Sequence, residues 1–170
     1  MQRQRNIFLV GPMGTGKSTV GRLLAAELQR SFYDSDHEIE ARCGCGIPWI
    51  FDVEGEAGFR SRERDVIASL TAMAGIVMAT GGGAILCPEN RRHLRSRGLV
   101  IFLRTSVEQQ LRRTQRDRNR PLLQCDDPEQ RLRALFKIRE PLYRDVAHWT
   151  ISTERRGPRA VVNEIKRRLR

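Results

Sequence analysis

One loop near the start of the chain constrains its fold more than any other feature: residues 11–18 read GPMGTGKS and match the pattern G-x-x-x-x-G-K-[ST]. A short run that is apolar on both faces, 7–10, comes directly before it, which is typical of a buried parallel strand. Apolar residues then recur at helical spacing over 17–28. Glycines let successive backbone N–H groups point inward, and the helix start adds its positive end. The segment therefore predicts a strand, a phosphate-binding loop and a helix.

The lysine and the serine of this loop have expected roles. In loops of this kind the lysine neutralises the β- and γ-phosphates of a nucleotide and the hydroxyl ligates Mg²⁺. The alternative is a glycine-rich turn that only packs a helix on a strand. GTPases, ATPase motors and small kinases all share the element, so the loop alone leaves the reaction open. The predicted nucleotide-binding residues here are Gly14, Thr15, Gly16, Lys17, Ser18 and Thr19.

The rest of the chain alternates short apolar runs with amphipathic segments. Its 170 residues, 39% of them hydrophobic, are enough for one domain with a sizeable core. Alternating strands and helices favour an open parallel α/β sheet, here with five strands. We expect strands at 7–10, 31–33, 76–79, 99–103 and 150–152. We expect helices at 17–28, at 36–42 with Asp36 as the cap, at 88–97, at 106–113, after the cap Asp127 with a kink at Pro141 near the helix end, and from Pro158 onward.

Several classes of protein are excluded. No apolar run approaches the roughly 18–20 residues of a membrane-spanning helix, and glycines interrupt the first apolar stretch too early for a secretory signal. We therefore expect a cytoplasmic protein. The four cysteines form no pair of CxxC motifs and the three histidines are isolated, which argues against zinc. Cys43 and Cys45, in Cys-Gly-Cys, are either a redox couple or ordinary reduced thiols.

The charge is strongly basic and unevenly distributed. The net charge is +11, of which residues 104–170 carry +9, and arginine supplies 28 of the 31 basic residues. Because guanidinium groups grip phosphate and carboxylate oxygens in pairs, anionic ligands are expected. The alternative for most positions is a solvated surface. A nucleic-acid-binding protein is a further alternative, although the sequence has no aromatic-studded strand or recognition helix, and a salt titration would distinguish it.

The sequence also narrows the type of nucleotide-binding protein. Residues 52–55 fit the D-x-x-G of GTPases, but no buried strand precedes them and no N-K-x-D is present. The third strand ends in Thr-Gly-Gly-Gly at 80–83, where many ATPases place an aspartate for Mg²⁺. Because ligands of open α/β sheets collect at the carboxyl ends of the strands, Asp34 and Asp36 after the second strand are the available carboxylates.

Six motifs occur in order over nearly the whole chain. They are the phosphate loop with Thr19–Arg22, Asp34-Ser35-Asp36, Ile50-Phe51 with Gly55-Glu56 and Phe59-Arg60, Gly81-Gly82-Gly83, Arg120–Leu123, and Arg139–Arg144. Together these motifs resemble those of the shikimate kinase family. The resemblance implies a P-loop, nucleoside-monophosphate-kinase-like three-layer sandwich around a five-stranded parallel sheet. It also implies transfer of the γ-phosphate of ATP, with Mg²⁺, to the 3-hydroxyl of shikimate.

The resemblance assigns substrate-binding residues. Arginine forks suit the carboxylate of shikimate, an aspartate can accept from its hydroxyls, and glycine N–H groups allow close approach. Asp36 would orient or deprotonate the attacking hydroxyl, and Glu63 would support Arg60 or nearby hydroxyls. The implied substrate set is Asp36, Phe51, Phe59, Arg60, Gly82, Gly83 and Arg144, and the implied substrate-binding subdomain covers about 34–62.

The same resemblance assigns residues around the nucleotide. Asp34 would hold Mg²⁺ through water beside Ser18. A lid at about 114–127 would deliver Arg120 to the transferring phosphate, so that Lys17, Asp36 and Arg120 form the catalytic set. Arg113 would stack on adenine, and the segment from Arg156 to Pro158 would line its other side.

Two points stay open at this stage. A gluconate or nucleotide kinase of the same architecture is the nearest alternative, and monomer is the default expectation.

The chain also departs from the family pattern at Gly46, where a hydroxyl residue is usual, and at Pro48-Trp49. These departures affect the substrate-binding subdomain and remove no proposed catalytic group.

Overall fold

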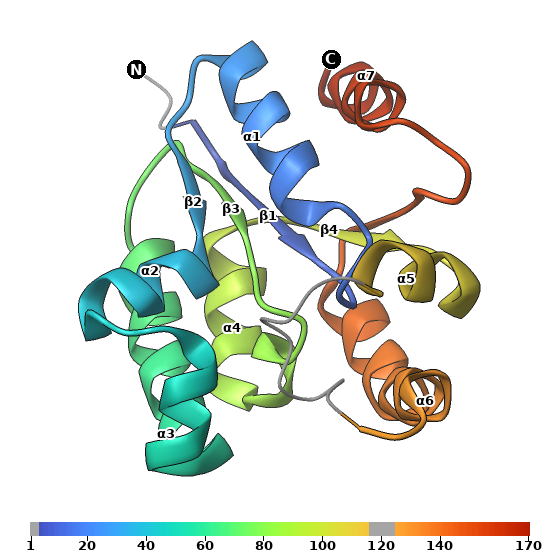
Figure 1. Cartoon of the computed structure of the whole chain (residues 1–170). Coiled ribbons are helices and arrows are strands. Elements are labelled where there is room, and N and C mark those ends of the chain that lie inside the picture. The colour runs from blue at the N-terminus through green and yellow to red at the C-terminus, as the bar shows by residue number, and fades with distance from the viewer. Residues whose placement is uncertain (1–3, 116–124) are drawn as a thin grey trace.

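The computed structural model describes residues 4–115 and 125–170, which build a parallel sheet covered by helices on both faces (Figure 1). The sheet has five strands in the order β2-β3-β1-β4-β5, and every neighbouring pair is parallel. The predicted five-stranded parallel sheet is therefore confirmed. Its strands are β1 (Asn6–Val10), β2 (Phe32–Asp34), β3 (Val77–Ala79), β4 (Gly98–Arg104) and β5 (Trp149–Ser152).

The helices form the two outer layers. Figure 1 shows α1 and α7 together on one side of the sheet, away from α3 and α4. Among residues 4–115 and 125–170, no helix combines the length and apolar character needed to cross a membrane. The helices are α1 (Lys17–Leu28), α2 (Ser35–Cys43), α3 (Ile47–Thr71), α4 (Pro88–Arg97), α5 (Val107–Thr114), α6 (Pro128–Val146) and α7 (Pro158–Leu169), with a short 3₁₀ turn η1 (Ala84–Leu86).

The alternation of side chains along β1 explains why both faces are covered. Ile7 and Leu9 pack into a cluster with residues of α1 and α7. Phe8 and Val10 point the other way, into a cluster with residues of α3, α4 and α6. All four are essentially inaccessible to solvent. Since successive strand residues face opposite sides, a run with no polar member needs an apolar layer on each face, and the result is the three-layer sandwich.

The long helix α3 is the element that the sequence pattern did not predict. Two glycines and several charged residues interrupt its apolar spacing. The backbone at Gly55 leaves the helical region, with φ of +70° and ψ of −178°, so that α3 consists of two helical segments joined by a bend. The D-x-x-G of residues 52–55 thus falls inside a helix and has no relation to a GTPase motif.

One predicted helix cap is wrong and another is confirmed. Asp34, and not Asp36, caps α2: its side chain accepts hydrogen bonds from the backbone nitrogens of Asp36 and His37, so the helix begins at Ser35. The helix that starts after Asp127 is α6, which ends at Val146 and contains Pro141 near its end. Asp127 caps α6 as expected, because its side chain accepts from Gln130 N at 3.0 Å.

Candidate active site

The phosphate loop lies between the end of β1 and the start of α1. No side chain caps α1, so its first-turn amides are available to an anion. Lys17 is buried, and its Nζ donates to the carbonyl of Pro12 at 2.8 Å. Thr15 Oγ1 donates to the same carbonyl at 3.0 Å. These contacts fold the loop around its lysine and leave the helix terminus facing a cavity.

Asp34 joins the end of β2 to the phosphate loop. Its Oδ2 accepts a hydrogen bond from Ser18 Oγ, so the two residues predicted to hold a metal are in direct contact. Hydroxyl and carboxylate oxygens are ligands that suit Mg²⁺, which keeps several waters and binds few protein groups. The described residues contain no cluster of three or more His, Cys, Asp or Glu side chains that could hold a metal ion.

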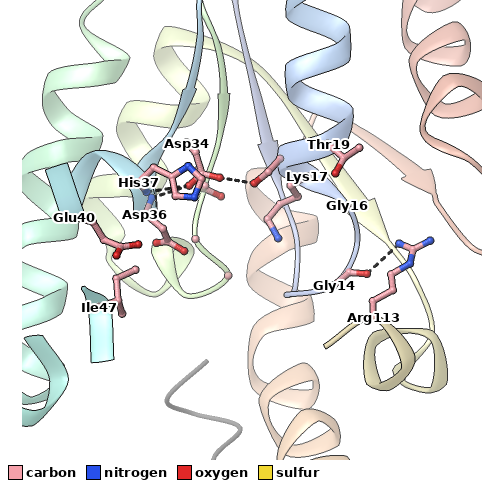
Figure 2. A pocket seen from close by; sticks show the side chains of 14 residues that line it. Gly14, Gly16, Lys17, Thr19, Asp34, Asp36, His37, Glu40, Ile47 and Arg113 are labelled. Atoms are coloured by element: carbon pink, nitrogen blue, oxygen red, sulfur yellow. Dashed lines mark hydrogen bonds between the residues drawn. The ribbon is translucent and has the colours of Figure 1, made fainter. Parts of the chain in front are cut away.

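A cavity of about 380 Å³ separates the phosphate loop from α2. Figure 2 shows Lys17, Gly14 and Arg113 on one side of it and Asp34, Asp36 and Glu40 on the other. Thr15 is buried in the loop and does not line it. The lining comprises Gly14, Gly16, Lys17, Ser18, Thr19, Asp34, Asp36, His37, Glu40, Ile47, Thr80, Gly81, Gly82 and Arg113.

The three glycines after β3 allow charged side chains to pack directly against the backbone. A methyl group on Gly81 would come within 2.6 Å of Asp36 Oδ1 and 3.0 Å of Glu63 Oε2. On Gly83 it would come within 2.3 Å of Arg60 Nη2. Any larger residue would displace these groups, so the Gly-Gly-Gly run holds two carboxylates and one guanidinium together at the edge of the cavity.

Glu63 and Arg60 form a buried ion pair on α3. Arg60 Nη1 donates to Glu63 Oε1 at 2.9 Å, and Glu63 is 1% exposed. Burial raises the pKa of Glu63 to about 7, with Asp36 adding to the shift and Arg60 opposing it. Glu63 Oε2 and Arg60 Nε are buried and have no hydrogen-bond partner among the described residues. Such unsatisfied groups beside a cavity are suited to a polar ligand.

The structure corrects the prediction for Arg144. Its side chain is 55% exposed and pairs with Glu140 on the surface of α6, away from the cavity. Arg139, one and a half turns earlier on α6, is 4% exposed. Its Nη1 lies 3.6 Å from the position that a methyl group on Gly82 would occupy. Burial lowers the pKa of Arg139, and the nearby charge of Arg60 acts in the same direction. The second arginine beside the glycines is therefore Arg139.

Phe51 and Phe59 do not line the cavity. Their rings pack against each other, with centroids 4.9 Å apart. The guanidinium carbon of Arg60 lies 5.2 Å from the centre of the Phe59 ring. The Phe59 ring therefore contacts Arg60 directly, and Phe51 packs against Phe59.

The residues expected around adenine are only partly brought together. Arg113 lines the cavity and donates from Nη1 to the Gly14 carbonyl at 3.0 Å. Arg156 instead pairs with Glu164 at 2.7 Å. Pro158 lines a separate apolar groove of about 670 Å³, which shares Thr19 with the cavity. Arg120 lies outside the described residues.

Comparison with known proteins decides the family. The family model for shikimate kinase matches residues 13–170. The chain belongs to the shikimate kinase family. It is 65% identical over 170 residues to the shikimate kinase of Chromohalobacter salexigens, covering 100% of this chain and 94% of that one. Members of the family are ATP-dependent kinases.

Solved structures of shikimate kinases share the fold. A shikimate kinase from Acinetobacter baumannii, in complex with shikimate, superposes with a TM-score of 0.96 at 57% identity, covering 98% of this chain and 93% of that one. The shikimate kinase of Aquifex aeolicus gives a TM-score of 0.85 at 36% identity, with 96% and 95% coverage. The P-loop, three-layer architecture predicted from the sequence is thereby confirmed.

Several residues that line the cavity of this shikimate kinase family member were not predicted from the sequence. His37, Glu40 and Ile47 line the cavity, yet no motif distinguished them. Arg139 could have been found from helical periodicity, because it lies four residues before the buried Tyr143, whereas Arg144 falls on the next position around the helix. The motif contained both arginines, and only the helical spacing separates them.

Proposed function

We propose that this chain transfers the γ-phosphate of ATP to the 3-hydroxyl of shikimate, giving shikimate 3-phosphate and ADP. The observation that carries the proposal is the meeting of two unlike surfaces around one cavity. One is a phosphate loop with its buried lysine. The other is the glycine run 81–83 with the carboxylate of Asp36 and two guanidinium groups, that of the half-buried Arg60 and that of the buried Arg139. A small ring acid with hydroxyls matches the second surface.

On the acceptor side, Arg60 and Arg139 bind the carboxylate of shikimate. Both guanidinium groups lie against the glycines, and Glu63 fixes one of them through the 2.9 Å ion pair. Asp36, which lines the cavity opposite Lys17, accepts from the attacking hydroxyl and orients it toward the γ-phosphate (Figure 2). The backbone N–H groups of Gly82 and Gly83 complete this set.

On the donor side, the phosphate loop from Gly14 to Thr19 holds the triphosphate, with Lys17 against its β- and γ-oxygens. Ser18 and Asp34 would hold Mg²⁺, which would supply positive charge against the phosphates. Arg113 packs on adenine, with Pro158 and Arg156 near its other face. Arg120, beyond the described residues, stabilises the transferring phosphate, an assignment that comes from the family resemblance alone.

Other parts of the proposal concern the whole chain. We place the reaction in the cytoplasm and assign the chain as a monomer that binds neither nucleic acid nor membranes. The substrate-binding subdomain at about 34–62 and the lid at about 114–127 stay predictions, since most of the lid falls outside the described residues.

A coupled assay of ADP release tests the proposed substrate. With ATP and Mg²⁺ we expect turnover with shikimate and only background rates with gluconate or AMP. The reason is that paired guanidinium groups and one aspartate suit a cyclic hydroxy-carboxylate, whereas AMP requires a base pocket. Turnover with gluconate or AMP and none with shikimate would show that the acceptor is assigned wrongly.

A further inference from the structure

The turn between α2 and α3 contains a feature that the proposed reaction does not use. Cys43, the last residue of α2, and Cys45 are joined by a disulfide across a single residue. Their Cα atoms lie 5.3 Å apart, within the usual range for bridged cysteines. Both cysteines are partly exposed and partly packed against the apolar core, so the turn can be reached from solvent.

The bridge lies in the turn between two residues that line the cavity. Glu40, three residues before Cys43, and Ile47, two residues after Cys45, both line the cavity. The last backbone bond of α2 runs from Gly44 N to Glu40 O at 2.8 Å, and the first of α3 runs from Ile50 N to Gly46 O at 3.2 Å. The two helices that carry Asp36 and Arg60 are therefore joined through this bridged turn.

Opening the bridge would affect the turn more than the fold. Because it encloses only one intervening residue, it restricts the unfolded chain little, and disulfides that close short loops stabilise least in the chain-entropy description. The helices stay together through other contacts: Ile39, Ile47 and Ile50 share one buried cluster, and Arg42 Nη2 donates to Ser69 Oγ at 2.9 Å. Without the bridge, the link is Gly44, Cys45 and Gly46, two of which are glycines.

We propose that Cys43 and Cys45 form a reversible dithiol–disulfide site whose oxidation state sets the affinity of the cavity for shikimate. Its reaction partners are low-molecular-weight thiols and disulfides of the glutathione class. A thiolate attacks one sulfur of the bridge to give a mixed disulfide, and a second thiolate releases it, so that two thiols are oxidised while two electrons and two protons pass to the cysteines. Glutathione disulfide reverses the reaction and yields two glutathione thiols.

The expected kinetic consequence rests on the proposed kinase function. The bridged turn holds Glu40 and Ile47 in place before the substrate binds, so less ordering is needed on binding. We therefore expect the oxidised protein to have a KM for shikimate about threefold lower than the reduced protein, with kcat changed much less.

The chemical part of the proposal is tested on the full chain by thiol alkylation. The protein is equilibrated in glutathione buffers from fully reduced to strongly oxidising, alkylated, digested and analysed by mass spectrometry. We expect Cys43 and Cys45 to lose and regain alkylation together, independently of Cys87 and Cys125, which have no disulfide partner. The proposal is overturned if both cysteines are alkylated in every buffer, or if they stay bridged under full reduction. Neither result depends on kinase activity.

The coupling to the cavity is tested by measuring KM and kcat in both redox states. A Cys43→Ser/Cys45→Ser variant should show one KM in all buffers, near that of the reduced wild type. A Cys87→Ser variant is the matched control and should keep the wild-type response. Reversible bridging with equal KM values in both states, or a redox response that persists in the double variant, would refute the coupling. An inactive wild type with reversible bridging would count against the kinase function and the coupling, but not against the dithiol site.

Discussion

Arg139 and Arg144 are close in sequence and occupy opposite environments. Arg139 is 4% exposed beside Gly82, whereas the side chain of Arg144 is 55% exposed and paired with Glu140. A surface ion pair of this kind contributes little free energy, while a buried guanidinium needs a partner to offset its loss of water. The carboxylate of a bound acid is such a partner, which is why the buried arginine is assigned to the substrate.

This assignment predicts unequal effects of two matched substitutions. Arg139→Ala should raise the KM for shikimate by about 30-fold or more, since removing one member of a buried charge pair costs roughly 2 kcal/mol at least. Arg144→Ala should change KM by less than about threefold. Steady-state kinetics measures both, and unfolding curves show whether each variant is folded. Equal KM values for the two variants would contradict the assignment of Arg139.

The raised pKa of Glu63 predicts a dependence of stability on pH. The pKa of this carboxyl is about 7 in the folded protein, against a reference value of 4.5, because burial disfavours the charged form. The native state therefore binds the proton more tightly than the unfolded chain, and the resulting stability is present at low pH and lost as pH rises from about 4.5 to 7.

The Glu63→Gln variant isolates this contribution because it keeps a neutral side chain at all pH values. Relative to the variant, the free energy of unfolding of the wild type should fall by up to about 1.4 kcal/mol per pH unit within the window. Urea unfolding at a series of pH values measures the difference. Parallel pH profiles of the two proteins would show that Glu63 does not titrate there.

At the scale of secondary-structure elements, the sheet and the phosphate loop could be predicted from the sequence, whereas helix α3 could not. Strands β1, β3 and β4 are short runs that are buried on both faces, and strong turn signals flank them, so the local pattern is enough to predict them. In α3, Gly55 and Gly58 interrupt the helical pattern, and its inner face includes the charged Glu63 as well as apolar residues. Tertiary packing against the sheet, and not local preference, makes this segment helical.

In the candidate site, too, residues in local motifs were predictable and residues placed by tertiary packing were not. Lys17, Ser18, Asp34, Asp36 and Arg60 belong to motifs with fixed spacing, and the structure brings them to one cavity or its edge. His37, Glu40 and Ile47 line the cavity only because of how α2 and α3 pack. A motif read without its helical phase also selected Arg144 in place of Arg139.

The bend in α3 makes a further prediction. Gly55 has a combination of φ and ψ that only glycine adopts readily, and the space around it is open, so an added methyl group would meet no atom within 4 Å. Gly55→Ala should therefore lower the free energy of unfolding by about 1–3 kcal/mol through backbone strain alone. Urea unfolding measures the change, and an unchanged midpoint would mean that the bend adapts to alanine.

At the scale of the whole molecule, the fold brings together groups from five separate parts of the chain. The parallel strands end at one edge, where the phosphate loop after β1, Asp34 at the end of β2 and the glycines after β3 meet. Helices α3 and α6, on one face of the sheet, add Arg60 and Arg139. In the proposed function, part of the arginine excess binds anions at this edge.

In the proposed reaction, the γ-phosphate of ATP and one hydroxyl of shikimate face each other across this cavity. The most direct measurement is ³¹P and ¹³C NMR of the product formed by the full chain from ATP, Mg²⁺ and shikimate. We expect a single phosphate ester on the 3-hydroxyl, formed in equal amount to ADP. Release of inorganic phosphate without an ester, or an ester on another hydroxyl, would contradict it.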